Sequence, residues 1–167
     1  MNSNVIKCSH ANNVSRLVCV LSTCIYPDVT SYPIDASALH AGAPHPSNEG
    51  YAYAKRMCAV QCQLYNEQYG TNYACVVPTN LYGPNDCYTV ESSHVVAALI
   101  RRASELSDGE PLTVWGSGTP LRQFCYTPDL ASLLLWVTFD PVKVSEPLAL
   151  LPEAEHTIAE LATSIAS

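Results

Sequence analysis

Basic residues are scarce in this chain. Only eight of its 167 residues are lysine or arginine, and the formal net charge is −7. Nucleic acids and anionic membrane surfaces bind proteins through clustered basic side chains. The adjacent basic pairs are Lys55-Arg56 and Arg101-Arg102, and we assign each to a ligand site or to a solvated helix face. The composition therefore predicts that neither nucleic acid nor a membrane is a partner.

Long apolar segments are also missing. The longest nearly apolar stretch, Leu130 to Phe139, is well short of the roughly 18 residues that a membrane span needs. Met1 to Ser15 is too polar to be a secretory leader. The eight cysteines lie mostly within apolar strand or helix patterns, as reduced thiols do. We therefore expect a cytoplasmic protein.

The spacing of metal-ligating residues is incomplete. Cys58 and Cys62 are one helical turn apart and could ligate a metal ion. No second pair of cysteine or histidine residues with zinc spacing follows them. The sequence therefore predicts no metal site.

A glycine-rich turn is absent as well. The first of the seven glycines is Gly42, and no G-x-G-x-x-G series follows it. Gly116-Ser-Gly118 comes nearest, but Leu121 takes the place of the third glycine, so this segment is predicted to be a turn. Glycine-rich turns let backbone amides approach the pyrophosphate of a dinucleotide. The chain therefore lacks the usual phosphate-binding turn of a Rossmann fold.

What the sequence does contain is an alternation of strands and helices. Apolar runs predict strands at residues 16–21, 73–77, 112–116 and 148–151. Helices are predicted at residues 5–13, 48–69, 93–105 and 156–166, with another starting at Thr127. Long loops are expected at residues 27–46 and 85–92. This order is typical of a parallel sheet, in which chemistry gathers at the carboxyl ends of the strands.

Three polar residues fit that location. Ser22 directly follows the first strand, while Tyr51 and Lys55 are four positions apart and therefore share one face of the predicted helix. A free phenol has a pKa near 10, and a neighbouring ammonium favours the phenolate and assists proton transfer. A hydroxyl at the strand end can hold a substrate oxygen by hydrogen bond. These residue types suit the reduction of a ketone.

Five segments together resemble the GDP-L-fucose synthase family of extended short-chain dehydrogenase/reductases. They follow the family's order and cover nearly the whole chain: Ser22-Thr-Cys-Ile-Tyr-Pro27, Ser47 to Lys55, Pro78-Thr-Asn-Leu-Tyr-Gly-Pro84, Ser93-His-Val95 with Arg101-Arg102, and Trp115 to Arg122. The resemblance implies an α/β fold, with a partial Rossmann-like parallel sheet, its helices, and part of a smaller substrate-binding domain. Residues 1–84 would be the C-terminal part of the Rossmann-like domain. Residues 85–167 would be mostly the substrate-binding portion, with interleaved Rossmann elements, in one compact unit.

The resemblance also implies a two-stage reaction. GDP-4-keto-6-deoxy-D-mannose would be epimerised at C3 and C5, and NADPH would then reduce its C4 ketone to give GDP-L-fucose. Cys24 and His94 would be the acid/base pair of the epimerisations, while Ser22, Tyr51 and Lys55 would serve the reduction. A thiolate or an imidazole can remove a proton alpha to a ketone, and inversion requires a second group on the opposite face.

The same resemblance assigns ligand contacts and a quaternary structure. Arg102 and Arg122 would hold the diphosphate of the GDP-sugar, and Trp115 would offer a flat face to its guanine. The complete enzyme would be a homodimer. The nicotinamide side of the cofactor would be lined by Val20, Leu21, Ser22, Thr23, Lys55, Pro78, Thr79, Asn80, Leu81 and His94.

Two further interpretations stay open. The chain resembles the middle of an enzyme, because the family's N-terminal βαβ half and its last substrate-domain segments have no counterpart here. It could belong to another nucleotide-sugar epimerase or dehydratase that shares the Tyr-x-x-x-Lys pattern, or it could be an inactive remnant that acts only in binding. Because the phosphate-binding turn is missing, we expect negligible binding of NADPH by the isolated chain.

Overall fold

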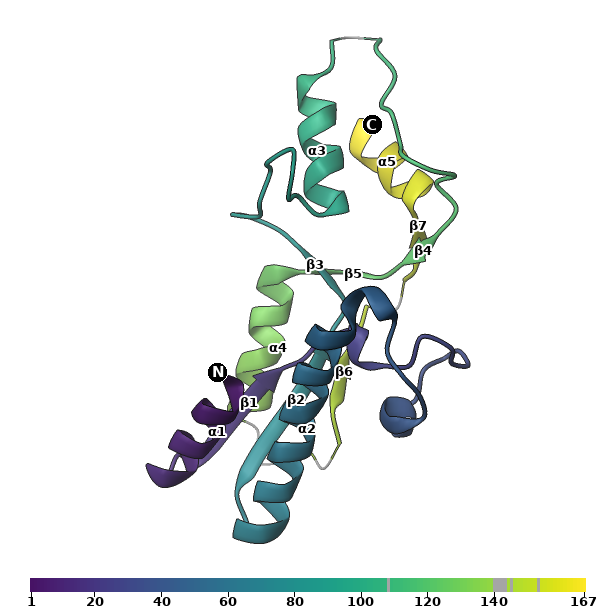
Figure 1. Cartoon of the computed structure of the whole chain (residues 1–167). Coiled ribbons are helices and arrows are strands. Elements are labelled where there is room, and N and C mark those ends of the chain that lie inside the picture. Colours follow the sequence, from purple (N-terminus) through teal and green to yellow (C-terminus); the bar gives the residue numbers. More distant parts are fainter. Residues whose placement is uncertain (108, 140–143, 145, 153) are drawn as a thin grey trace. The chain divides into compact units, whose positions relative to one another are not determined.

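The apolar runs form the centre of a parallel sheet in the computed structural model of the chain. The structure describes residues 1–107, 109–139, 144, 146–152 and 154–167. β1 (Arg16–Val20), β2 (Asn72–Pro78) and β6 (Leu148–Leu150) are hydrogen-bonded in the order β1-β2-β6, with both pairs parallel. The central strand β2 lies between β1 and β6 (Figure 1). Six of its seven residues are buried, as expected for a strand covered on both faces. The predicted α/β fold with a partial Rossmann-like parallel sheet is confirmed.

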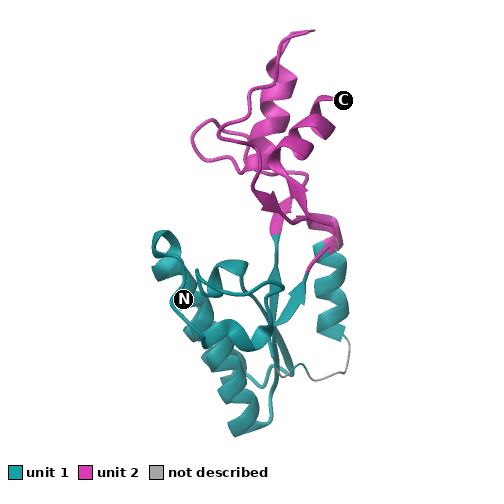
Figure 2. Ribbon diagram, turned by 90° about the vertical axis from the view of Figure 1, so that its right-hand side faces the viewer, with its two compact units in different colours: residues 1–79, 130–150 teal, residues 80–129, 151–167 magenta. Residues whose placement is uncertain are grey.

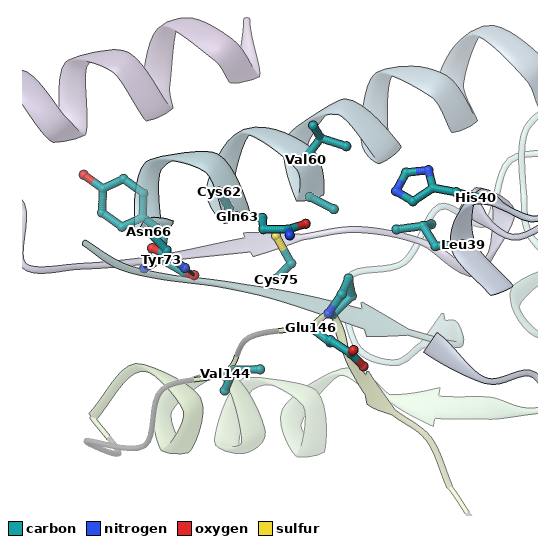
Figure 3. A pocket seen from close by; sticks show the side chains of 12 residues that line it. Leu39, His40, Val60, Cys62, Gln63, Asn66, Tyr73, Cys75, Val144 and Glu146 are labelled. Carbon is teal, nitrogen blue, oxygen red and sulfur yellow. Dashed lines mark hydrogen bonds between the residues drawn. The ribbon is translucent and has the colours of Figure 1, made fainter. Parts of the chain in front are cut away.

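Helices cover both faces of this sheet. α1 (Asn2–Ala11) packs against α2 (Glu49–Tyr69), and α2 packs against β2. Leu17 and Cys19 of β1 face α2 in the main hydrophobic core. Arg16 points to the other face, where its guanidinium donates to the carbonyl of Val137 in α4 (Thr127–Phe139). Because successive strand residues point to opposite faces, α4 lies across the sheet from α2 (Figures 2 and 3).

A second set of elements consists of short strands and two amphipathic helices. β3 (Asn80–Tyr82) pairs in parallel with β5 (Phe124–Tyr126), and β4 (Leu121–Arg122) pairs antiparallel with β7 (His156–Thr157). α3 (Val95–Glu105) packs against α5 (Ile158–Ala166). Three short 3₁₀ helices connect β1 to α2: η1 (Thr23–Ile25), η2 (Ala36–His40) and η3 (Pro46–Asn48).

The chain divides into two compact units (Figure 2). The first unit holds residues 1–79 and 130–150, and the second holds residues 80–129 and 151–167. The parallel sheet and the main core belong to the first unit. Residues 130–150 return to the first unit, which adds β6 to the sheet after the chain has built most of the second unit.

Two details of the predicted secondary structure change. The strand predicted at residues 112–116 does not form. The Thr113 carbonyl in this segment accepts a hydrogen bond from the Arg102 side chain rather than from a neighbouring strand. The strands β3, β4, β5 and β7 were not predicted, because two or three residues are too few to show an alternating pattern. No helix among the described residues has the length and apolar character needed to cross a membrane.

Candidate active site

Ser22 and Cys24 lie where β1 ends and η1 begins. The backbone amide of Leu21 donates to the Val76 carbonyl of β2, which extends the sheet pairing by one residue. Ser22 then caps η1, and its Oγ accepts a hydrogen bond from the backbone amide of Cys24 at 3.3 Å. Both side chains are partly exposed. The carboxyl edge of the parallel sheet therefore carries a serine and, two residues further on, a cysteine, both partly exposed.

Helix α2 brings Tyr51 and Lys55 to the same region. The Lys55 Nζ donates to the Val20 carbonyl at 2.8 Å, which ties this helix face to the end of β1. The same Nζ lies 5.8 Å from the centre of the Tyr51 ring. The Tyr51 side chain is about half exposed, so its hydroxyl is accessible to a ligand. The two side chains thus share one face of α2, and that face is held against the strand end.

The buried side chain of Arg56 ties α2 to the segment between β1 and α2. It is only 6% exposed, so the expectation that it lies on a solvated helix face is wrong. Its Nε donates to the Ile25 carbonyl of η1, and its Nη1 donates to the Gly42 carbonyl at 2.8 Å. Its neighbours on the helix face, Ala52 and Ala59, are small and buried, which leaves room for the guanidinium. This alanine spacing is the sequence signal that could have identified Arg56 as a buried residue.

The segment after β2 offers further ligand contacts. The Pro78 side chain is buried, and the Thr79 Oγ1 is buried with no hydrogen-bond partner among the described residues. Beyond Thr79, the Asn80 amide donates to the Gln123 carbonyl at 3.0 Å, and Leu81 is about one-third exposed. A buried hydroxyl without a partner is unfavourable unless a ligand satisfies it. Val20, Leu21, Thr23 and Lys55 lie with Thr79 in the first unit, whereas Asn80 and Leu81 lie in the second. The predicted lining of the nicotinamide side of the cofactor by these residues stays a prediction.

His94 occupies the N-cap position of α3. Its backbone carbonyl accepts from the amide of Ala98 at 2.8 Å, but its imidazole makes no capping hydrogen bond. The residue is exposed. The ring is therefore not committed to stabilising the helix and is available to a ligand.

Arg102 and Trp115 lie together in the second unit, and Arg122 is held separately. The guanidinium carbon of Arg102 is 4.1 Å from the centre of the Trp115 ring, at stacking distance. The indole is 77% exposed. Arg122 lies in β4, where its Nη1 donates to the Leu121 carbonyl at 2.7 Å. An exposed indole beside a guanidinium is a suitable surface for a purine base and an attached phosphate.

The predicted catalytic residues belong to both units. Ser22, Cys24, Tyr51 and Lys55 lie in the first unit, and His94 lies in the second. The structure therefore places four of them around one strand end. The pairing of Cys24 with His94 stays a prediction. Among the residues that the structure describes, no group of three His, Cys, Asp or Glu side chains is arranged to hold a metal ion.

Comparison with known proteins gives close relatives. The chain is 46% identical over 168 residues to the GDP-L-fucose synthase of Dictyostelium discoideum, covering 99% of this chain and 52% of that protein. It is 43% identical over 137 residues to the GDP-L-fucose synthase of Escherichia coli, covering 81% of this chain and 43% of that protein. The chain thus spans about half the length of these relatives.

A solved structure shows the same fold. The GDP-L-fucose synthetase of Naegleria fowleri bound to NADP matches with a TM-score of 0.90 and 40% identity, covering 98% of this chain and 51% of that one. The family model for NAD dependent epimerase/dehydratase proteins matches residues 1–148. This match covers β1, β2, α2 and every predicted catalytic residue. The chain therefore belongs to the NAD dependent epimerase/dehydratase family.

Proposed function

We propose that this chain carries the catalytic centre of a GDP-L-fucose synthase, which epimerises GDP-4-keto-6-deoxy-D-mannose at C3 and C5 and reduces its C4 ketone with NADPH. One observation carries the proposal: a hydroxyl, a thiol, a phenol and an ammonium gather at the end of β1. Ser22 and Cys24 are joined by a hydrogen bond, and Lys55 joins α2 to Val20. The 46% identical relative with that activity supports the choice of substrate.

The reduction would use the residues of α2. NADPH, when bound, supplies the hydride to C4 of the sugar. The Tyr51 hydroxyl delivers a proton to the C4 oxygen, and the Lys55 ammonium beside the ring stabilises the negative charge that the phenol then carries. The Ser22 hydroxyl donates a hydrogen bond to the same oxygen and orients the ketone.

The epimerisations would use Cys24 and His94. One of these groups removes a proton from the carbon next to the ketone, and the resulting enolate is stabilised by the hydrogen-bond donors at the C4 oxygen. The other group returns a proton to the opposite face of that carbon, which inverts it. Repeating the exchange at the carbon on the other side of the ketone inverts C5 as well as C3. The Arg102 and Trp115 pair would hold the diphosphate and the guanine during these steps.

A chimera tests the activity. In this chimera the present chain replaces the matching half of the Dictyostelium relative, which supplies the rest of the protein. The chimera is incubated with GDP-4-keto-6-deoxy-D-mannose and NADPH. We expect loss of NADPH absorbance and formation of GDP-L-fucose, with the complete relative as the positive control. A folded chimera that reduces the ketone without inverting C3 and C5 would favour a different nucleotide-sugar enzyme. A folded chimera that binds the nucleotide but catalyses neither step would favour a binding role.

Two substitutions in the chimera separate the steps. Cys24→Ser should suppress exchange of the C3 and C5 protons with deuterated water, while a ketone that needs no epimerisation is still reduced. Tyr51→Phe should lower the rate of reduction by about 10²-fold to 10⁴-fold while the proton exchange continues. Equal loss of both steps in either variant would contradict this division of roles.

The chain alone should bind NADPH very weakly. The chain carries the residues that we propose line the nicotinamide end, but no glycine-rich turn provides amides for the pyrophosphate. Calorimetric titration of the isolated chain should show no saturation at micromolar NADPH, whereas the chimera should saturate. Micromolar affinity in the isolated chain would contradict this expectation.

A homodimer is also part of the proposal. Tyr53, Met57 and Leu64 of α2 are each about half exposed and recur at helical spacing, which gives an apolar stripe on the outer face of the helix. Such a stripe is suited to packing against the same helix of a second copy. In the chimera, Met57→Glu should convert a dimer to a monomer in light-scattering measurements, while Lys7→Glu on the exposed surface of α1 should not.

We further place the protein in the cytoplasm. No disulfide joins any of the described cysteines, which suits a reducing compartment. Fluorescence microscopy of the tagged protein would test this location.

A further inference from the structure

Three thiols lie together between α2 and the sheet, apart from the residues assigned to catalysis. Cys19 comes from β1, Cys62 from α2 and Cys75 from β2. The Sγ atoms of Cys62 and Cys19 are 3.6 Å apart. Cys19 and Cys75 are register partners in the parallel pair of β1 and β2. None of these thiols has a part in the proposed epimerisation or reduction.

The three sulfurs differ in their chemical character. The thiols of Cys62 and Cys75 donate hydrogen bonds to Cys19, and these bonds, with a smaller contribution from the Lys55 ammonium, lower the pKa of Cys19. The pKa of Cys62 is raised, chiefly because its thiol would lose the hydrogen bond that it donates to Cys19 on ionising. The pKa of Cys75 is raised for the same reason, and also because its thiol would lose a hydrogen bond to Cys62. The cluster thus combines one sulfur that favours the nucleophilic thiolate with two that remain protonated.

A small cavity reaches two of the three thiols, those of Cys62 and Cys75. Its volume is about 30 Å³, and its lining includes Cys62 and Cys75 together with His40 and Glu146 (Figure 3). A cavity of this size holds a water molecule. Hydrogen peroxide is only slightly larger than water, whereas a peptide disulfide such as oxidised glutathione is far too large to enter.

From this geometry we infer that Cys19 and Cys62 form a dithiol that hydrogen peroxide oxidises to a disulfide joining β1 to α2. The thiolate of one residue attacks a peroxide oxygen, the O–O bond breaks, and the departing hydroxide takes up a proton to become water. The sulfur of the other residue then attacks the sulfenic acid, the S–O bond breaks, and a second water leaves with the remaining thiol proton. Overall, two thiols lose two hydrogen atoms to one peroxide.

The approach that the disulfide requires is small. A disulfide has an S–S distance of about 2.05 Å, so the two sulfurs must move closer by about 1.5 Å. Rotation of the side chains can provide part of this movement. The bond would connect the strand that leads to Ser22 and Cys24 with the helix that carries Tyr51 and Lys55. Oxidation would therefore act on two elements that position the proposed active site.

Mass spectrometry of the chain tests the inference. The folded chain is treated with one equivalent of hydrogen peroxide, the remaining thiols are alkylated, and the protein is digested. We expect a linked peptide that contains Cys19 and Cys62, lighter by two hydrogen atoms than its reduced parts and released by dithiothreitol. The same treatment with oxidised glutathione should leave these two thiols alkylated, because the cavity excludes it.

Two comparisons decide whether the fold directs this pairing. In urea, where the cluster is dispersed, the Cys19–Cys62 link should fall to the level of other pairs among the eight cysteines. Cys62→Ser should abolish the link, whereas Cys8→Ser, at an exposed cysteine on α1, should leave it unchanged. The urea comparison uses the unsubstituted chain, so it remains decisive if Cys62→Ser does not fold.

Oxidation at other thiols in place of the Cys19–Cys62 pair would overturn the inference. Cys87 is exposed, and hydrogen bonds with Ser92 and Thr89 lower its pKa. Oxidation of Cys87 while Cys19 and Cys62 both remain alkylated would overturn the proposal. So would a link from Cys75 to either of the other two thiols in place of the Cys19–Cys62 link, or the same mixture of links in folded and urea-treated chains.

Discussion

The two units position their polar residues by different means. In the first unit, Ser22 and Lys55 are held by a buried parallel strand and by a long helix packed on it. In the second unit, Arg102 and Trp115 lie on the surface and contact each other across a segment that forms no strand. Proton transfer requires fixed geometry within a fraction of an ångström, whereas a flexible nucleotide can be held by adaptable surface groups. The difference in packing therefore matches the roles proposed for Ser22 and Lys55 in catalysis and for Arg102 and Trp115 in substrate binding.

Replacing the buried Arg56 should lower the free energy of unfolding of the first unit more than any other substitution considered below. Arg56→Met would leave the carbonyls of Ile25 and Gly42 without their donor, so we expect a loss of about 2 to 4 kcal/mol in the free energy of unfolding. Urea denaturation followed by circular dichroism would measure it. Lys7→Met, at an exposed position of α1, should change the free energy by less than about 0.5 kcal/mol. Equal effects of the two substitutions would contradict a structural role for Arg56.

Gly83 in the second unit and Gly50 in the first differ in how well each position accommodates an added Cβ atom. Gly83 of the second unit has φ +152°, and a Cβ there would lie 2.3 Å from the Thr127 Oγ1. Gly83→Ala should therefore lower the free energy of unfolding by about 1 to 3 kcal/mol. Gly50 lies in the first turn of α2 with no atom near its added Cβ, so Gly50→Ala should raise stability by up to about 1 kcal/mol. Denaturant titrations showing the same sign for both would contradict this contrast.

Substrate affinity should depend on one arginine of α3 and not on its neighbour. In the chimera, Arg102→Ala should raise the KM for the GDP-sugar by about tenfold, which corresponds to about 1.4 kcal/mol, because it removes the guanidinium beside Trp115 that we propose contacts the diphosphate. Arg101 pairs instead with Glu105 at 3.0 Å, so Arg101→Ala should leave KM nearly unchanged. Steady-state kinetics would distinguish them, and a larger effect of Arg101→Ala would contradict the assignment of Arg102.

The smallest expected effect is on the pH dependence of stability, through the capping residues at the start of α5. The backbone amide of Thr157 donates a hydrogen bond to the Glu160 carboxylate, and the Thr157 hydroxyl donates a second one. These bonds, the first more than the second, lower the pKa of Glu160 below its ordinary value of 4.5. Because the folded-state pKa is the lower one, the stabilisation is present above about pH 4.5 and is lost as the pH falls through the folded pKa. Glu160→Gln should reduce the acid sensitivity of the second unit, measured by thermal unfolding from pH 6 to pH 3. An unchanged pH profile would contradict the contribution of this capping box.

Much of the first unit could be predicted from sequence because its elements are long. The 21 residues of α2 and the continuous apolar run of β2 show clear patterns, and the spacing of Tyr51 and Lys55 places them on one helix face. The second unit was harder to predict. Its strands have two or three residues, and Trp115 lies in a segment whose apolar character suggested a strand. Local patterns carry too little information there, since pairing with distant residues determines the structure.

The sequence by itself determined the helix face shared by Tyr51 and Lys55 and the position of Ser22 at a strand end, because both follow from short-range periodicity. It also determined the family, through the order of its motifs. Only the tertiary structure decided that Arg56 is buried beneath η1 and that Cys19, Cys62 and Cys75 form one cluster. These arrangements depend on contacts between residues more than 30 positions apart in sequence, and such contacts exist only after α2 has packed on the sheet.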